Sequence, residues 1–118
     1  MSSKHPPERL PLSPPEFTIL LPVADGEKHG YAILKEVETR TSGSVILSTG
    51  TLYAIIKRLL TDGIVEEIGS RIDDDDERRR YYRLTTLGRK VATAEAARLS
   101  DLVASARRKK LIGKPRLA

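Results

Sequence analysis

The sequence STGTLYAIIKRLLTDG at residues 48–63 shows the clearest helical pattern in the chain. Ser48 to Thr51 can open a helix, and Asp62-Gly63 can close it. The apolar positions follow helical spacing without a miss and are Leu52, Ile55, Ile56, Leu59 and Leu60. The centre of the opposite face consists of Gly50, Ala54, Lys57 and Thr61. On periodicity alone this is an ordinary amphipathic helix with a solvated face, and only the surrounding elements can give that face a further role.

Two helices are predicted before this stretch. Ser13-Pro14-Pro15-Glu16 has the form of a capping box, and apolar residues at helical spacing follow as far as Ala24. Pro22 lies inside this segment and is expected to kink it, because proline cannot donate the helical hydrogen bond. The second helix is predicted over Tyr31–Arg40, and Val45-Ile46-Leu47 could form a strand stub.

After residue 63 the pattern changes from helix to strand and back to helix. Residues 64–68 and 80–84 are predicted to form a hairpin with a long acidic tip. Thr85 or Thr86 can cap a last helix that runs to about Ile112, a length of about 40 Å. Three helices, a hairpin and a long helix make a mainly α (α+β) fold. This order is that of a winged helix-turn-helix, whose third helix enters the DNA major groove.

Composition narrows the functional classes. The chain has 118 residues, enough for one domain, and its net charge of +5 favours an anionic partner such as nucleic acid. The absence of Cys excludes disulfides, cysteine-based zinc or iron–sulfur sites and thiol nucleophiles. His5 and His29 are the only histidines, and the sequence has no nucleophile elbow, glycine-rich phosphate loop or metal triad. We therefore expect no enzyme activity, no cofactor and no metal site.

The sequence also indicates where the protein acts. Its longest uncharged apolar stretch, residues 18–24, is far shorter than the roughly 20 residues of a membrane-spanning helix. The N-terminal MSSKHPPERLPL has no apolar core and is not expected to be a signal peptide. We expect a cytoplasmic protein with no membrane partner. The acidic run at residues 73–76 lacks the alternating pattern of a calcium loop and is interpreted as a solvated turn.

Three motifs resemble the PadR family of bacterial transcriptional regulators, and the chain length resembles the short subgroup of that family. The motifs are HGYAILKEVE at 29–38, STGTLYAIIKRLLTDGIVE at 48–66 and DERRRYYRLTTLGRKV at 76–91. The resemblance implies a homodimer that binds double-stranded DNA at an inverted repeat, usually as a repressor. The segments expected are a disordered tail (1–12), a winged helix-turn-helix DNA-binding domain (13–84), a dimerisation helix (85–112) and a basic tail (113–118).

Site residues follow from the resemblance position by position. The expected DNA-binding residues are Tyr31, Thr49, Gly50, Thr51, Tyr53, Lys57, Arg78, Arg79 and Arg80. His29 is expected to be a structural or capping residue. Tyr81 and Tyr82 alternate across a strand, so one should pack in the core and the other should lie at the wing. The expected dimer interface consists of Phe17, Leu20, Val91, Leu99, Leu102, Val103 and Ala106. The alternative for the last helix is that it folds back over its own core.

Other functions remain open at this stage. The chief alternative is a winged-helix module that binds protein and does not recognise a DNA sequence. Membrane-surface binding by the basic run at 107–110 is weakly supported, because that run lacks bulky aromatic residues. Some PadR-like proteins bind planar aromatic ligands between subunits. Because the chain has no Trp and Phe17 is its only Phe, a tryptophan-based stacking pocket is excluded, and a small-molecule effector has no residue assigned to it.

Overall fold

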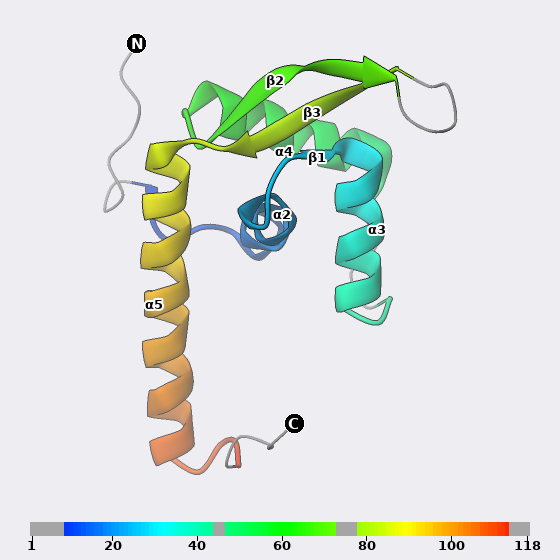
Figure 1. Cartoon of the computed structure of the whole chain (residues 1–118). Coiled ribbons are helices and arrows are strands. Elements are labelled where there is room, and N and C mark those ends of the chain that lie inside the picture. Colours follow the sequence, from blue (N-terminus) through cyan, green and yellow to red (C-terminus); the bar gives the residue numbers. More distant parts are fainter. Residues whose placement is uncertain (1–8, 44–46, 73–77, 114–118) are drawn as a thin grey trace.

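The computed structural model describes residues 9–43, 47–72 and 78–113, apart from the side chains of residues 71, 72 and 78. Its helices are α2 (Pro14–Ala24), α3 (Gly30–Arg40), α4 (Thr49–Thr61) and α5 (Thr86–Arg108). Its strands are β1 (Lys28–His29), β2 (Val65–Ile72) and β3 (Arg78–Leu84). This order is the winged helix-turn-helix with a long C-terminal helix that the sequence predicts, and the fold class is confirmed (Figure 1).

The sheet is small and antiparallel, with the strand order β1-β3-β2. β2 and β3 form the predicted hairpin, in which Val65 pairs with Leu84 and Ser70 pairs with Arg80. The register shifts between Glu67 and Ser70, where Gly69 has a φ of 107° that suits glycine. The sequence analysis missed β1, because two residues are too short to show a strand pattern. β1 matters for the site, because it brings the start of α3 alongside β3.

The hydrophobic core lies where the helices meet the sheet. It is formed by the apolar faces of α2, α3 and α4, the inner side of the hairpin and Val91 of α5. Figure 1 shows α2 between α5 and α3, and it shows β3 leading into the start of α5. α4 turns its apolar face to this core, and its other face is exposed to solvent.

Residues 9–12 correct the predicted disordered tail. Leu12 is only 4% exposed and belongs to the core, and the Arg9 guanidinium pairs with the carboxylates of Glu16 and Asp62. The prolines and polar residues of this segment suggested disorder. The structure gives Leu12 an apolar socket and Arg9 two acidic partners from distant parts of the chain, which the local sequence does not show. Residues 1–8 lie outside the described part.

Helix boundaries follow the predicted signals to within a residue, except at the end of α5. The capping box of Ser13 and Glu16 is present, and Thr85 caps α5. α2 continues through Pro22 to Ala24, and Pro22 is buried in its last turn. α5 ends at Arg108 and not near residue 112, because Lys110 takes a left-handed φ of 63° and closes the helix. Of the predicted strand stub, only Leu47 is described, and it lies in no strand; the acidic run at 73–76 lies outside the described residues.

The junction between the hairpin and α5 is closely packed. The backbone N–H of Thr85 donates to the Ile64 carbonyl at 3.1 Å, and the Thr85 hydroxyl accepts from the backbone N–H of Gly88 at 2.8 Å. A Cβ atom at Gly88 would lie 1.8 Å from the carbonyl oxygen of Ile64. The first turn of α5 can approach the backbone before β2 this closely only because residue 88 has no side chain.

We expect Gly88→Ala to destabilise the fold by about 1–3 kcal/mol, because backbone atoms must move to admit the methyl group. The free energy of unfolding from urea denaturation measures this loss. Gly50→Ala is the matched control, since no atom lies within 4 Å of a Cβ at Gly50. Equal stability of the Gly88→Ala variant and the wild type would contradict the described junction.

Candidate nucleic-acid interface

The N-terminus of α4 is open to solvent and well capped. The Ser48 hydroxyl accepts a hydrogen bond from the backbone N–H of Thr51 at 3.0 Å, and it lies 2.9 Å from the Thr51 hydroxyl. The side chains of Thr49 and Thr51 are exposed, and the space beside Gly50 is empty. The first turn therefore presents backbone amides, two hydroxyls and no bulky side chain, which suits the approach of an anion.

The rest of α4 divides into two faces as the sequence predicts. Leu52, Ile55, Ile56 and Leu59 are buried in the core. Tyr53, Ala54, Lys57 and Arg58 are exposed on the other side. The outward face thus combines small residues near the N-terminus with two cations farther along the helix.

Tyr53 connects α4 to the start of α3. Its ring lies directly over Gly30, where a Cβ atom would come within 2.2 Å of the Tyr53 hydroxyl oxygen. Gly30 is buried beneath this ring, although Tyr53 itself is 43% exposed. The position of Tyr53 on the surface therefore depends on the absence of a side chain at residue 30.

Tyr31 is the centre of a second group of side chains, contributed by α3 and the wing. Its ring is 52% exposed and has cations near it from two elements. The Arg79 guanidinium carbon lies 5.2 Å from the ring centroid, and Lys35 Nζ lies 5.9 Å from it. The His29 ring stacks at a centroid distance of 6.5 Å. Cation–π contacts of this kind hold positive charge in place at an exposed surface.

His29 acts as the predicted capping residue. Its Nδ1 atom accepts a hydrogen bond from the backbone N–H of Ala32 at 3.1 Å, at the N-terminus of α3. Tyr81 packs edge-on against the His29 ring at 5.3 Å, whereas Tyr82 is buried in the core. Burial raises the pKa of the Tyr82 phenol. Tyr82 is thus the tyrosine that packs, and Tyr81 is the one nearer the wing surface.

Between these groups lies a polar hollow of about 340 Å³. It is lined by His29, Gly30, Tyr53, Arg79, Arg80 and Tyr82. The fold thus brings Tyr53, Arg79 and Arg80 together from α4 and β3, with Tyr31 beside them. Thr49, Gly50 and Thr51 lie on the first turn of α4, and Lys57 lies farther along it. The side chain of Arg78 is outside the described residues.

The sequence analysis missed Lys35 as a member of this surface. The signal was available, because Lys35 follows Tyr31 by one helical turn and side chains four residues apart share a helix face. The contact between Arg79 and Tyr31 could not be found in the same way, since it joins segments that are distant in the sequence.

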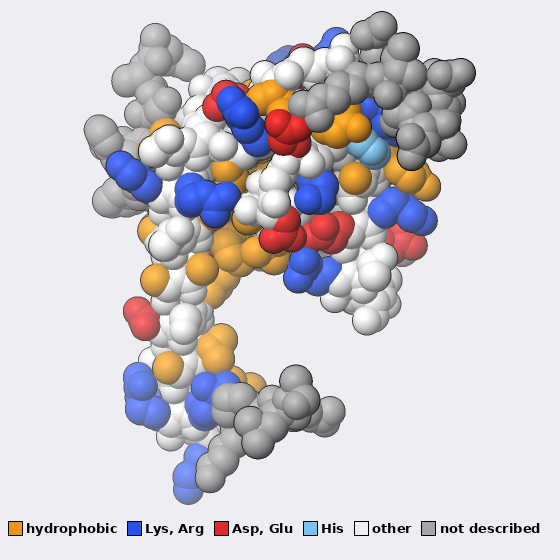
Figure 2. All heavy atoms as spheres, in the orientation of Figure 1, with side chains coloured by type: hydrophobic (Ala, Val, Ile, Leu, Met, Phe, Trp, Pro, Cys, Tyr) orange, Lys and Arg blue, Asp and Glu red, His pale blue; other side chains and the backbone are white. Residues whose placement is uncertain are grey.

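A different surface runs along α5. Figure 2 shows hydrophobic side chains in the angle between α5 and the rest of the domain. Phe17 is partly buried there, between two hollows of about 170 and 320 Å³. Farther along α5, Leu102 and Val103 are 55% and 43% exposed, and Leu99 and Ala106 are partly covered.

Two residues of the predicted dimer interface belong elsewhere. Leu20 and Val91 are 1% and 0% exposed, because the core of the same chain covers them. They have no surface left to offer a second copy, and their assignment to a dimer contact is corrected. Helical spacing placed Val91 on the stripe of α5, but the first turns of α5 face the domain, and only the later turns leave it.

The described residues contain no helix that is long and apolar enough to span a membrane. Within the same residues, no three His, Cys, Asp or Glu side chains gather as they would around a metal ion. The fold and the surfaces described above define a winged-helix protein in which α4 and the wing are exposed and partly cationic.

Comparison with known proteins identifies the family. Residues 19–94 match the model of the transcriptional regulator PadR-like family, and the chain belongs to this family of transcriptional regulators. A protein of Lysinibacillus sphaericus described as "Uncharacterized protein X" is 34% identical over 85 residues, which are 72% of this chain and 71% of that protein.

Solved structures have the same fold. A transcriptional regulator from Clostridium thermocellum superposes with a TM-score of 0.64 at 26% identity, over 80% of this chain and 86% of that one. Bacillus subtilis PadR in complex with operator DNA superposes with a TM-score of 0.59 at 18% identity, over 92% of this chain and 52% of that one. The second likeness is one of fold.

We expect Gly30→Ala to destabilise the protein by about 1 kcal/mol, because the methyl group displaces the Tyr53 ring. Replacing Tyr53 by Ala removes the clash, so the same Gly30→Ala change should cost less in a Tyr53→Ala background. A double-mutant cycle from urea denaturation measures this coupling. Additive effects of the two substitutions would contradict the packing of Tyr53 on Gly30.

Proposed function

We propose that this chain is a homodimeric, sequence-specific repressor that binds double-stranded DNA at an inverted repeat. α4 enters the major groove, and the hairpin of β2 and β3 lies beside it as the wing. The observation that carries the proposal is the outward face of α4, where an open, capped first turn stands beside the cationic group around Tyr31. The operator complex of Bacillus subtilis PadR supports the same use of this fold.

The chemistry of this surface suits a groove. Small residues at the start of α4 allow the backbone to approach the bases, and Thr49 and Thr51 offer hydroxyls to phosphates or base edges. Lys57 supplies a cation to the same side. Arg79 and Lys35 place positive charge near Tyr31, where a phosphate backbone would pass.

The dimer follows from α5. Its 23 residues extend for about 35 Å, and its later turns carry exposed Leu102 and Val103. A second copy related by two-fold symmetry would bury these residues together with Phe17 and Leu99. Pairing of α5 helices would also set the distance between the two α4 helices, and this distance is the geometric requirement of an inverted repeat.

Regulation by a small-molecule effector belongs to the same proposal. The hollows on both sides of Phe17 lie where the second copy would pack. A ligand bound there would alter the dimer contact and release the operator. Such a protein acts in the cytoplasm of a bacterium, where the DNA is.

The alternative, a protein-binding module, is less well supported by the surface. A protein partner site usually contains aromatic anchors at its centre. The centre of the α4 face has Gly50 and Ala54, and Tyr53 lies at its edge over Gly30. Binding that weakens steeply with salt would favour DNA over a protein partner.

The experiment that tests the proposal is selection from a pool of random duplex DNA, followed by sequencing of the bound fraction. Enrichment of an inverted repeat supports a dimeric regulator and gives its half-site spacing. Absence of any enriched sequence, at a salt concentration that still permits binding, would contradict sequence-specific recognition.

We expect Lys57→Ala to weaken binding to the selected operator by roughly tenfold and to leave the dimer intact, because a cation is lost from the reading face. If Lys57 contacts a phosphate, the slope of log affinity against log salt should also fall by about one. Lys109→Ala is the matched control, since it removes the same charge at the far end of α5. Equal losses in both variants would show that only net charge matters.

We expect Leu102→Asp to weaken dimerisation on the order of a hundredfold and to abolish operator binding with it, because an unpaired carboxylate would enter an apolar contact. Sedimentation velocity and operator titration measure the two effects. Ser100→Asp adds the same charge at an exposed position of the same helix and is the control. A Leu102→Asp variant that remains dimeric would exclude this face of α5 as the interface.

A further inference from the structure

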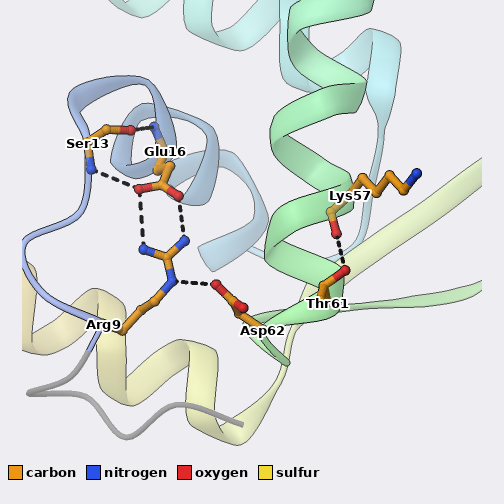
Figure 3. Close-up of polar contacts among 6 residues, drawn as sticks. All are labelled: Arg9, Ser13, Glu16, Lys57, Thr61 and Asp62. Atoms are coloured by element: carbon orange, nitrogen blue, oxygen red, sulfur yellow. Dashed lines mark hydrogen bonds and ion pairs between the residues drawn. The ribbon is translucent and has the colours of Figure 1, made fainter. Parts of the chain in front are cut away.

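Residues 9–12, which we call the N-terminal strap, contact parts of the domain that are distant in the sequence. Arg9 reaches the start of α2 and the end of α4 (Figure 3). Leu12 enters the core, and its backbone N–H interacts with the carboxylate of Glu95 on α5. One short segment therefore contacts α2, α4 and α5.

The Arg9 guanidinium is the centre of this connection. Its two terminal nitrogens pair with the two carboxylate oxygens of Glu16, with Nη1 3.4 Å from Oε1. Its Nε atom lies 2.9 Å from Asp62 Oδ2. The side chains of Arg9 and Glu16 are only 11% and 7% exposed, so solvent screens the pair weakly. The planar guanidinium fixes the Glu16 carboxylate in direction as well as distance, which a lysine could not do. Its contact with Asp62 is an ion pair without hydrogen-bond geometry, so Asp62 is held by charge.

Glu16 is also fixed from the side of α2. The backbone N–H of Ser13 donates to Glu16 Oε1 at 2.9 Å, within the capping box. Burial alone would raise the pKa of Glu16, but the hydrogen bonds from Arg9 and Ser13 hold it below its ordinary value. The carboxylate is therefore charged at neutral pH, and Arg9 stands between it and a second carboxylate, that of Asp62.

On the α5 side, the acceptor for the strap is itself held in place. Glu95 is buried on α5, and Arg98 donates to both its oxygens at 2.7 and 2.8 Å. These bonds lower the pKa of Glu95, burial opposes them, and the backbone N–H of Leu12 adds to the lowering. The ionised carboxylate thus provides a fixed acceptor for the strap.

The strap matters most for α4. α4 packs mainly on β2 and α3, and neither α2 nor α5 is among its main packing partners. Asp62 is the C-cap residue of α4, so the ion pair with Arg9 attaches the end of this helix to α2. Figure 3 shows Lys57 extending away from the ion-pair cluster, so the strap attaches α4 without occupying its outward face.

We propose that Arg9 is a positioning residue that holds α4 at the angle required for operator recognition. It does so by joining the C-cap Asp62 to Glu16 on α2, while Leu12 joins the same segment to α5. This inference rests on the proposed binding of DNA by α4. Without Arg9, two carboxylates would face each other, and their repulsion would move the end of α4 away from α2.

A purely structural role for Arg9 predicts a different result. It would lower the unfolding temperature and leave the folded protein with unchanged discrimination between operator and other DNA. A positioning role changes this discrimination, because bases are read only when the helix lies correctly in the groove, whereas attraction to phosphates tolerates small displacements.

The test uses the full chain with Arg9→Gln, which removes the charge and keeps a polar side chain. Arg40→Gln is the matched control, because Arg40 pairs with Glu36 on the exposed side of α3 and its loss changes the net charge equally. Asp62→Asn is the second variant and removes the α4 side of the ion pair alone. Circular dichroism melting sets a temperature at which all variants are folded.

At that temperature we expect Arg9→Gln to weaken binding to the selected operator by roughly tenfold, comparable with the loss of one base contact. Affinity for unrelated duplex DNA should change less than about twofold, and the salt slope should stay at the wild-type value, since no phosphate contact is lost. Asp62→Asn should show the same pattern, and Arg40→Gln should not. Equal weakening on operator and unrelated DNA, or none, would overturn the proposal.

Amide hydrogen exchange without DNA separates failure of this inference from failure of the proposed function. Arg9→Gln should speed exchange in the last turn of α4, near Asp62, and leave exchange in β3 unchanged. If the wild type selects no operator, the proposed function fails, and positioning for recognition falls with it. If the wild type binds an operator and the last turn of α4 exchanges equally fast in Arg9→Gln, the strap does not hold the helix, and only the further inference fails.

Discussion

The contact between the first turn of α5 and the Ile64 carbonyl is the constraint on which the arrangement of the domain depends. Gly88 admits this contact, and Thr85 satisfies the backbone groups at the junction. The direction in which α5 leaves the hairpin is fixed there. Because α4 leads directly into β2, the same junction relates the exposed end of α5 to the outward face of α4.

The buried acidic side chains are also held by specific partners. Two acidic residues, Glu16 and Glu95, are buried, and each has an arginine partner and a backbone N–H directed at it. Buried carboxylates are tolerable only with such partners. These acids therefore contribute little to the surface, where cations from α3, α4 and the wing remain exposed. Because one arginine matches each of these acids, the net charge of +5 comes from the remaining residues.

The sequence predicts most of the fold because its signals are local. The capping box at Ser13, the cap at Thr85 and the apolar period of α4 each depend on residues within a few positions of one another. β1 was not predicted. Residues 9–12 were predicted to be disordered but are ordered, and Val91 was predicted to lie in the dimer interface but is buried. All three depend on contacts with distant segments, which a local pattern cannot reveal.

The candidate site shows the same division. The exposed face of α4 follows from periodicity, and the site residues on it came from the family resemblance. The contact of Arg79 with Tyr31 did not follow, because Arg79 of β3 and Tyr31 of α3 are distant in the sequence. The packing of the Tyr53 ring on Gly30 could not be predicted either, because the two residues lie on different helices. Their roles in binding DNA stay predictions.

Two separate connections relate α5 to α4, and together they have a consequence that neither has alone. The junction at Gly88 acts on the end of α4 through the turn into β2, and the strap acts on the same end from α2 through Asp62. Core packing along α4 holds its buried face, and the two connections hold its C-terminal end from different directions. In the proposed dimer, the spacing of the two α4 helices would then be set by α5, and their tilt in the groove by the strap. A shift of α5 relative to the domain would therefore act on the end of α4 through either connection.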